Sequence, residues 1–406
     1  MTVAGNETRI LLLEGIHEAA VESLAVAGYG NVERFTHSLS GSDLLDAIGD
    51  ADFIGIRSRT QLDAAALGAA KKLKAIGCFC IGTNQVDLDA ARRMGIPVFN
   101  APFSNTRSVA ELAIADIILL MRGIPEKSAR AHRGEWAKTA RNAYEVRGKC
   151  LGIIGYGRIG SQLGILAEGL GMRVLYYDVE HKLPLGNAAA VISLQELLAE
   201  ADVVSLHVPE TPTTRNIIDA EAMRAMRPGA LLINAARGSV VDIEALALAL
   251  ETGHIGGAAI DVFPVEPKSN QEIFESPLRE FDNVILTPHI GGATEEAQYN
   301  IAREVVAKLV KYNDNGSTVS AVNFPQVTIP DHENHRRILH IHKNEPGVME
   351  QINRVFSKRG VNVAAQYLET HADVGYVVMD IELDDAGPLL DELRAIAATI
   401  RVRLLH

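Results

Sequence analysis

Short apolar runs alternate with amphipathic stretches along most of the chain. Near its start, residues 10–13, 53–56 and 75–78 are continuous apolar runs of the length expected for strands. Strands of a parallel sheet read this way because helices cover both faces of the sheet and exclude water from it. The pattern therefore predicts a parallel α/β sheet in the N-terminal region.

A second series of apolar runs begins at Leu151. A stretch at 112–121 precedes it and is apolar almost all round, which predicts a helix buried between domains. The strands expected after Leu151 are 174–177, 203–208, 230–234, 258–262 and 284–286. This series predicts a second parallel sheet, longer than the first.

The C-terminal part of the chain has a different order of elements. A long helix is expected at 295–312, and a polar break at 314–317 followed by Pro325 and Pro330 predicts a linker. Beyond it we expect, in order, a strand, a helix, two strands, a helix and a strand, at 337–342, 348–358, 362–368, 376–381, 389–398 and 400–404. This βαββαβ order is typical of a small ferredoxin-like domain.

Composition narrows the function classes. The chain has 406 residues, and at about 150 residues per domain this gives two or three domains. Its net charge of −12 offers no general attraction to phosphate backbones, which disfavours nucleic-acid binding. No segment approaches the roughly 18 apolar residues of a membrane span, and the first residues lack the pattern of a signal peptide. Cys78, Cys80 and Cys150 cannot all pair and show no zinc spacing. We therefore expect a cytoplasmic protein with no metal and no membrane partner.

A glycine triplet indicates a dinucleotide site. Gly155, Gly157 and Gly160 form G-x-G-x-x-G directly after an expected strand and before an expected helix. In this motif the first glycine permits a tight turn, the second lets a pyrophosphate approach, and the third lets the helix pack on the strand. Asp178 ends the next strand, where it can bind both ribose hydroxyls and repel a 2′-phosphate. The motif therefore predicts NAD rather than NADP, whereas a lone glycine-rich turn would mean nothing.

Three polar groups follow apolar strands of the second series. Arg237 comes after the strand ending at residue 234, and Glu266 and His289 come after the next two strands. A hydride transfer from a 2-hydroxy acid needs a base near neutral pKa and a cation for the carboxylate, which histidine and arginine supply. A neighbouring carboxylate raises the histidine pKa and fixes its tautomer. Each residue alone could equally be structural, but together they predict the catalytic residues.

These residues carry a family resemblance. The segments 234–238, 261–267 and 288–292, with 81–87 and 100–106, resemble the D-isomer-specific 2-hydroxyacid dehydrogenases over nearly the whole chain. The resemblance is closer still to the branch that oxidises 3-phosphoglycerate, the first reaction of phosphorylated serine synthesis. It implies that Arg237, Glu266 and His289 are catalytic. The residues that it implies for NAD binding are Gly155, Gly157, Arg158, Ile159, Gly160, Asp178, Val208, Pro209, Ala235, Ala236, Arg237, Asp261, His289, Gly291 and Gly292.

The resemblance also implies a domain plan. The expected architecture is α/β, with two Rossmann-like doubly wound parallel-sheet domains plus a C-terminal ferredoxin-like βαββαβ domain. The expected domains are a substrate-binding domain at 1–104 and 292–330, a NAD-binding Rossmann domain at 105–291, and a regulatory domain at 331–406. The active site is expected between the first two. Members of the family are commonly dimers or tetramers, and we expect a homotetramer.

The substrate phosphate has to be read from the N-terminal domain. Arg57 and Arg59 follow an expected buried strand, and two guanidinium groups this close can bind one phosphate dianion, although two solvated surface charges remain an alternative. Ser58 and Asn105 offer neutral donors. Further expected substrate contacts come from Ile81, Gly82 and Lys138. Lys138 lies close to Trp136, which is expected either to anchor a neighbouring subunit or to pack within its own chain.

The C-terminal domain resembles an ACT domain. Such domains bind small amino acids where two copies meet, and in similar enzymes the ligand is L-serine, the end product. His342, Asn344 and Asn362 are the expected serine contacts. The alternative for His340 and His342 is one exposed and one hydrogen-bonded strand residue. Because the expected linker at 330–335 contains no glycine, coupling to the active site could be weak.

Two other functions remain open from the sequence. One is a dehydrogenase for an unphosphorylated acid such as 2-hydroxyglutarate, glycerate or glyoxylate, which would not need Arg57 and Arg59 together. The other is a binding protein on the same scaffold that senses NADH and recruits partners. A complete set of Arg237, Glu266 and His289 disfavours a pure sensor, since a sensor has no use for a base.

Overall fold

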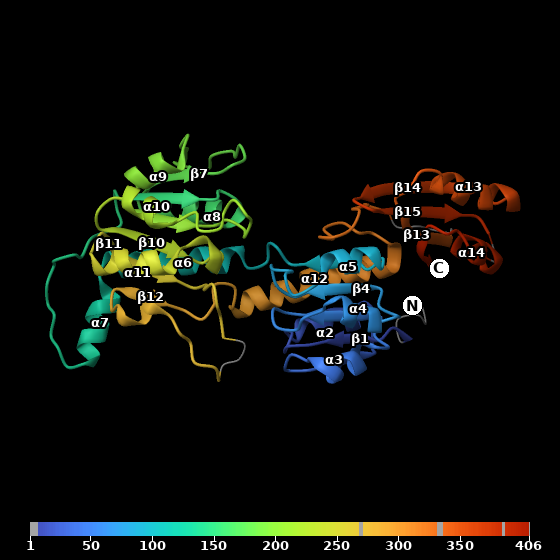
Figure 1. The fold of residues 1–406 in the computed structure, drawn as a ribbon, viewed down its shortest axis with the longest axis horizontal. Helices are drawn as coiled ribbons and strands as arrows, with labels where there is room; N and C mark the ends of the chain where they lie inside the picture. Colours follow the sequence, from blue (N-terminus) through green and yellow to red (C-terminus); the bar gives the residue numbers. More distant parts are fainter. Residues whose placement is uncertain (1–6, 268–270, 331–335, 384–385, 406) are drawn as a thin grey trace. The chain divides into compact units, whose positions relative to one another are not determined.

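The computed structural model describes residues 7–267, 271–330, 336–383 and 386–405. The chain forms two compact units, Met1–Ser104 with Gln298–His406, and Asn105–Ala297. The first unit contains both the N-terminal and the C-terminal sheet, and the second contains the longest sheet (Figure 1). The expected division into three domains stays a prediction.

The N-terminal sheet is parallel throughout, with the strand order β2-β1-β3-β4-β5. Helices cover both of its faces, α2 and α12 on one and α3, α4 and α5 on the other. The strands are β1 (Ile10–Leu12), β2 (Val32–Arg34), β3 (Phe53–Ile56), β4 (Ala75–Cys78) and β5 (Val98–Asn100). The helices are α2 (Ala19–Val26), α3 (Gly41–Ile48), α4 (Ala64–Ala69), α5 (Leu88–Arg93) and α12 (Glu295–Asn315). Because all strands are parallel, the loops after them meet at one edge of the sheet.

The second unit is built on a seven-stranded parallel sheet with the order β12-β11-β10-β9-β6-β7-β8. Its strands are β6 (Cys150–Ile154), β7 (Arg173–Tyr177), β8 (Ala189–Ala190), β9 (Val203–Leu206), β10 (Ala230–Asn234), β11 (Ile255–Ile260) and β12 (Val284–Leu286). Its helices are α6 (Thr106–Met121), α7 (Ile124–His132), α8 (Arg158–Gly169), α9 (Leu194–Glu200), α10 (Ala220–Ala225) and α11 (Ile243–Glu251), with 3-10 turns η1 (Gly238–Val240) and η2 (Pro277–Glu280). The order reverses at β6, between β7 and β9, which is the switch point where such sheets bind ligands.

Helix α6 differs from the expectation of an all-apolar helix. It begins at Thr106, six residues before the predicted start, and buries one face only. That face includes Asp116, which is 5% exposed. Burial, and to a smaller degree the charge of Asp261, raises the pKa of Asp116 to about 7. The apolar composition of this stretch therefore gave no indication that Asp116 is buried.

The C-terminal sheet is antiparallel with the order β14-β15-β13-β16, as the ferredoxin-like pattern predicted. Helices α13 and α14 pack on one face. The elements are β13 (Arg336–Lys343), α13 (Val348–Arg359), β14 (Val363–His371), β15 (Val374–Ile381), α14 (Gly387–Arg394) and β16 (Thr399–Leu405). Helix α14 ends before the expected residue 398, since the chain turns there to enter β16.

The other face of this sheet joins the core of its own unit. Leu339 and Tyr376 belong to the same apolar cluster as Phe324. Arg337, fully buried, donates to both carboxylate oxygens of Asp380 at 2.6 and 2.8 Å, and to the carbonyls of Asn315 and Pro330. Every polar end of this buried cation is therefore paired, as burial requires. Residues 331–335 of the expected linker lie outside the described residues.

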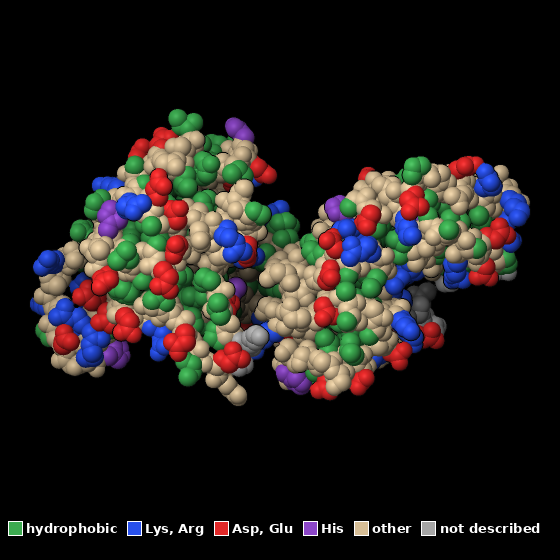
Figure 2. Space-filling model, in the orientation of Figure 1, with side chains coloured by type: hydrophobic (Ala, Val, Ile, Leu, Met, Phe, Trp, Pro, Cys, Tyr) green, Lys and Arg blue, Asp and Glu red, His purple; other side chains and the backbone are tan. Residues whose placement is uncertain are grey.

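The surface agrees with the composition. Figure 2 shows acidic and basic side chains interspersed over the visible face, with no continuous basic area. In the described ranges, no helix is both long enough and apolar enough to cross a bilayer.

Candidate active site

The glycine triplet forms the turn between β6 and α8. Gly155 has φ +91°, and a Cβ there would lie 2.4 Å from the carbonyl oxygen of His207, so only glycine fits. A Cβ on Gly160 would lie 2.2 Å from the carbonyl oxygen of Gly155, which explains the close packing of helix and strand. A Cβ on Gly157, by contrast, would meet nothing within 4 Å. Open space therefore lies in front of the N-terminus of α8, whose amides and dipole suit a phosphate.

Asp178 stands directly after β7. Its carboxylate accepts the N–H of Tyr156 at 2.8 Å and the N–H of Glu180 at 2.9 Å, and it remains partly exposed. Each oxygen keeps a second lone pair for a ligand hydroxyl. The carboxylate is therefore fixed beside the glycine turn before any ligand arrives.

Other residues expected at the cofactor site lie at the same sheet edge. Four of them follow β9 and β10 closely, two lie on the loop that begins after β12, and two more open helix α8. They are Val208, Pro209, Ala235, Ala236, Gly291, Gly292, Arg158 and Ile159.

His289 and Glu266 form a hydrogen-bonded pair. The Nδ1 atom of His289 lies 3.0 and 3.1 Å from the two carboxylate oxygens of Glu266, which also accepts the N–H of Phe263. The hydrogen bond to Glu266 raises the pKa of His289, although burial opposes it. Burial works against ionisation of Glu266 too, but the bond to His289 holds the pKa of that carboxyl below its ordinary value. With Nδ1 donating to Glu266, Nε2 is the nitrogen left to exchange a proton with a substrate.

Arg237 lies close to this pair. It follows β10, and its positive charge lowers the pKa of both Glu266 and His289. Gly238 lets the loop after β10 pack against the loop after β11. A Cβ on Gly238 would lie 2.0 Å from the carbonyl carbon of Phe263, so only glycine fits there. The three residues predicted as catalytic thus come together on loops after β10, β11 and β12.

Asp261 holds the loop that carries His289. Its Oδ1 atom accepts the hydroxyl of Thr287 at 2.6 Å and the N–H of Ile290 at 2.8 Å, and its Oδ2 atom accepts the N–H of Gly291 at 2.8 Å. His289 has φ +56°, a left-handed conformation that a non-glycine residue keeps only when its surroundings impose it. The buried carboxylate therefore fixes the backbone around the imidazole. This function was missed from the sequence, where Asp261 was assigned to the cofactor, an assignment that stays a prediction.

The substrate residues predicted in the N-terminal region follow two neighbouring strands. Arg57, Ser58 and Arg59 come after β3, and Ile81 and Gly82 come after β4. Arg59 and Ser58 are exposed, and Arg57 is partly buried. All five therefore lie at one edge of the first unit's sheet.

Three buried polar side chains that the sequence did not single out hold these loops. They are Glu14, Gln85 and Asn100, each under 10% exposed. Glu14 accepts backbone N–H groups of the loop after β3, while Gln85 and Asn100 donate to carbonyls of the loops after β3 and β4. A polar residue directly after an apolar strand was the available signal, and Glu14 after the run at 10–13 shows it.

Two other predicted substrate residues belong to the second unit. Asn105 precedes α6, is buried, and has a side-chain oxygen without a partner in the described part of the chain. A Cβ on Gly292 would lie 2.4 Å from the side-chain amide nitrogen of Asn105, so the side chain of Asn105 packs closely against this glycine. Lys138 lies on an exposed segment after α7.

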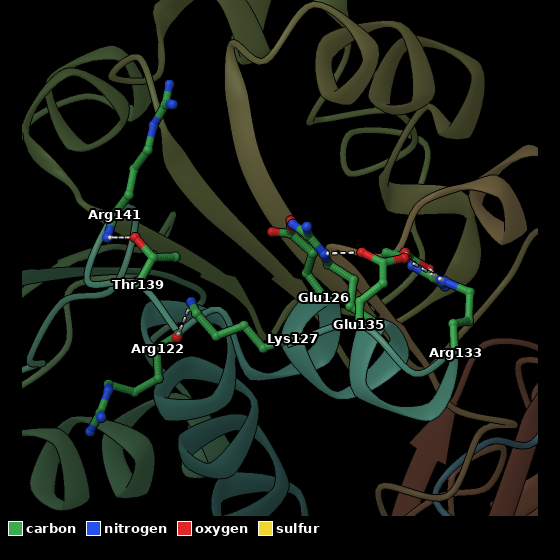
Figure 3. A network of polar contacts seen from close by, with 9 residues as sticks. Arg122, Glu126, Lys127, Arg133, Glu135, Thr139 and Arg141 are labelled. Atoms are coloured by element: carbon green, nitrogen blue, oxygen red, sulfur yellow. Dashed lines mark hydrogen bonds and ion pairs between the residues drawn. The ribbon is translucent and has the colours of Figure 1, made fainter. Parts of the chain in front are cut away.

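Ion pairs hold the segment around Lys138 to its own unit (Figure 3). Arg130 pairs with Glu126 and Glu135, and Arg133 donates to both oxygens of Asp282 at 3.2 and 2.5 Å. Trp136, between these anchors and Lys138, is 88% exposed. The alternative of a tryptophan packed within its own chain is therefore wrong.

The expected effector residues do not share one end of the C-terminal sheet. His342 pairs with Gly375 near the start of β15, whereas Asn362 precedes Val363, which pairs with Ile381 at the end of β15. His342 and His340 are 3% and 0% exposed, so the alternative of one exposed and one hydrogen-bonded histidine is wrong. Residues two apart on a strand share a face, and both rings face the helices. Asn344 follows β13 and donates to the carbonyl of Ala372, and Asn362 is exposed just before β14. In the described residues no group of three His, Cys, Asp or Glu side chains could hold a metal ion.

A doubly wound parallel sheet with a glycine-rich phosphate turn and a histidine–carboxylate pair after neighbouring strands defines a dinucleotide-dependent dehydrogenase. Residues 114–291 match the NAD-binding domain of the D-isomer-specific 2-hydroxyacid dehydrogenases, and residues 338–401 match an ACT domain like that of the AHAS small subunit. A protein from Haemophilus influenzae named D-3-phosphoglycerate dehydrogenase is 59% identical over 401 residues, which are 99% of this chain and 98% of the relative. One of the same name from Escherichia coli is 60% identical over 403 residues, again 99% and 98% of the two chains.

The solved structure of D-lactate dehydrogenase from Aquifex aeolicus, complexed with NAD and lactic acid, is also similar. It has a TM-score of 0.66 at 30% identity, covering 75% of this chain and 95% of that one. The chain belongs to the D-isomer-specific 2-hydroxyacid dehydrogenase family, and it is an oxidoreductase with a C-terminal ACT-like domain.

Proposed function

We propose that this enzyme oxidises 3-phospho-D-glycerate to 3-phosphohydroxypyruvate with NAD, the first step of phosphorylated L-serine synthesis. The observation that carries the proposal is the His289–Glu266 pair on a conformationally fixed loop. Full-length relatives named D-3-phosphoglycerate dehydrogenase support the choice of substrate. The three cysteines are free, which suits a reducing cytoplasm.

His289, Glu266 and Arg237 have different roles in the proposed oxidation. His289 takes the proton of the C2 hydroxyl at Nε2 as the C2–H bond breaks, and Glu266 stabilises the imidazolium that forms. Arg237 holds the substrate carboxylate through its planar fork. NAD, when bound, would supply the acceptor for the hydride from C2. In the reverse direction the imidazolium returns the proton to the oxygen of the 2-oxo acid.

Arg57 and Arg59 bind the phosphate in this proposal. They follow β3 at the edge where ligands of parallel sheets bind. Two guanidinium groups on one short loop match a dianion better than a single carboxylate.

Asp178 selects NAD. Its carboxylate is fixed beside the glycine turn, where a 2′-phosphate would meet its negative charge. Asp178→Ala is expected to narrow the preference for NAD over NADP by about tenfold, equal to about 1.4 kcal/mol. An unchanged ratio of kcat/KM for the two cofactors would contradict this role.

The substrate is tested by NADH consumption with 2-oxo acids. We expect rapid turnover of 3-phosphohydroxypyruvate and slow turnover of glyoxylate and 2-oxoglutarate. Equal or faster turnover of an unphosphorylated acid would favour the alternative dehydrogenase. NADH binding without turnover of any of them would favour a sensor.

L-Serine is the proposed effector of the ACT-like domain. The buried His342 and the amide of Asn344 offer donors and acceptors that an amino acid needs, and Gly347 at φ +87° opens helix α13 after them. Asn362 lies at the opposite end of the sheet, so in this proposal it contacts the ligand from a second copy of the domain. Asn344→Ala or Asn362→Ala is expected to relieve inhibition while kcat without serine stays nearly unchanged. Calorimetry that detects no serine binding to the intact protein would refute the site, and binding without inhibition would refute only the coupling.

A homotetramer completes the proposal. Trp136 is a large apolar side chain that stays exposed although ion pairs hold its segment to its own unit, which suits a contact with a second subunit. Lys138 would then add its charge to the neighbour's substrate site. Trp136→Ala is expected to reduce the assembly size by light scattering, and an unchanged tetramer would assign Trp136 another role.

A further inference from the structure

A buried carboxylate organises the loop that carries Arg57 and Arg59. Glu14 follows β1 and is 9% exposed. Its Oε1 atom accepts the N–H groups of Arg57 at 3.2 Å and Thr60 at 2.8 Å, and its Oε2 atom accepts the N–H of Arg59 at 3.0 Å. Three amides of four successive residues therefore converge on one carboxylate, which requires the loop to curl around it.

The backbone of Glu14 is held in an unfavourable conformation. Its φ is +64°, in the left-handed region that costs energy for a residue with a Cβ. The turn is fixed by the N–H of Glu14, which donates to the carbonyl of His37, and by the N–H of Gly15, which donates to that of Phe35. A non-glycine residue at such a position indicates that its side chain is required there.

The loop is also held from the other side. The side-chain amide of Gln85 donates to the carbonyl of Arg57 at 2.6 Å and to that of Gly82 at 3.2 Å. Gln85 is 5% exposed, so these bonds are shielded from water. The N–H and the C=O of Arg57 are thus both bound by buried side chains, one from the loop after β1 and one from the loop after β4.

We propose that Glu14 is a positioning residue for phosphate recognition, and that Gln85 assists it. This inference rests on the proposed binding of the substrate phosphate by Arg57 and Arg59. A long arginine side chain can reach many places, and fixing the backbone beneath it reduces the entropy that binding must overcome. Because a displacement of about 1 Å can cost about 100-fold in an enzyme site, the two arginines need this frame to share one phosphate.

Glu14→Gln is the direct test. Glutamine has the same shape, but only one acceptor oxygen, and its NH₂ group would face amides that also donate. We expect the KM for 3-phosphohydroxypyruvate to rise about 10-fold to 100-fold, with kcat, the KM for unphosphorylated hydroxypyruvate and NADH binding nearly unchanged. Asp52→Asn is the matched control, since the carboxylate of Asp52 also accepts a backbone N–H in this unit, that of Arg9, and lies before β3 instead of in the loop after it.

Gln85→Glu gives a second reading, because a carboxylate cannot donate to the carbonyl of Arg57. Gln85→Glu is expected to raise the KM for 3-phosphohydroxypyruvate as well. It can therefore test the proposal even if the Glu14→Gln variant fails to fold. Arg57→Ala is measured beside both. If Arg57→Ala loses selectivity for the phosphorylated substrate while both other variants keep it, the positioning role is refuted and the proposed phosphate site stands. If Arg57→Ala keeps the selectivity as well, the proposed phosphate site fails, and the positioning role fails with it.

Discussion

Asp261 and Glu14 serve the two units in the same way. Each is a buried carboxylate after a strand of a parallel sheet, and each accepts backbone N–H groups from the loop after another strand. Asp261 fixes the loop of His289, and Glu14 fixes the loop of Arg57 and Arg59. Both arrangements include a non-glycine residue at positive φ, His289 itself in one case and Glu14 in the other.

The difference lies in what the supported side chains do. In the proposed mechanism His289 moves a proton, so its displacement is expected to affect the transition state and lower kcat. In the same mechanism Arg57 and Arg59 bind a group that does not react, so their displacement is expected to weaken binding and raise KM. One structural arrangement should therefore act on different kinetic constants in the two units.

His289→Ala is expected to cause the largest loss of activity. Removing the general acid–base is expected to lower kcat by about 10² to 10⁴-fold, with NADH binding little changed. Steady-state rates and NADH fluorescence titration measure the two quantities. Near-normal kcat would remove His289 from the mechanism.

Asp261→Ala is expected to give the next largest effect. It leaves the N–H groups of Ile290 and Gly291 and the hydroxyl of Thr287 without their acceptor, and each buried unpaired donor costs about 1–3 kcal/mol. We expect a lower Tm and a fall in kcat of about 100-fold as His289 leaves its fixed position.

Asp219→Ala provides the control for Asp261→Ala. Asp219 accepts the N–H groups of Glu221 and Ala222 at the start of α10, away from the three catalytic residues. Its loss should cost about 1 kcal/mol of stability and leave kcat unchanged. If Asp261→Ala lowers Tm but keeps kcat, Asp261 supports the fold alone and the comparison with Glu14 fails.

Glu266→Gln is expected to have the smallest effect, on pH dependence. Glu266 raises the pKa of His289, so the protonated imidazole persists to higher pH than it would alone. Reduction needs this proton and declines as pH rises through the His289 pKa, and in Glu266→Gln the decline should begin at lower pH. Oxidation needs the neutral imidazole, and its rise should likewise move to lower pH. Unchanged profiles in both directions would show that another group titrates.

The sequence predicted the features that depend on neighbouring residues. The glycine turn, the strands and the βαββαβ order follow from local patterns, and so does the position of the three candidate catalytic residues after their strands. The contact between His289 and Glu266 followed from the rule that loops after parallel strands meet at one edge.

Support across strands was not predictable in this way. Glu14 and Thr60 lie 46 residues apart and meet only because β1 pairs with β3. The position of Glu14 after an apolar run was a signal for a residue at the sheet edge. It does not show that the carboxylate is buried and bound, because a carboxylate at such a position is ordinarily solvated. The same holds for Asp116 on α6, which its apolar neighbours concealed.

The central claim, that the loop after β3 selects a phosphorylated substrate, is tested most directly by one ratio. It is the kcat/KM for 3-phosphohydroxypyruvate divided by that for hydroxypyruvate, measured with NADH for the wild type and for Arg57→Ala combined with Arg59→Ala. We predict a ratio well above 100 in the wild type, since two charge-assisted contacts at about 1.5–3 kcal/mol each correspond to more than 100-fold, and a ratio near unity in the double variant. Equal proportional losses on both substrates would contradict the claim and assign the two arginines a structural role.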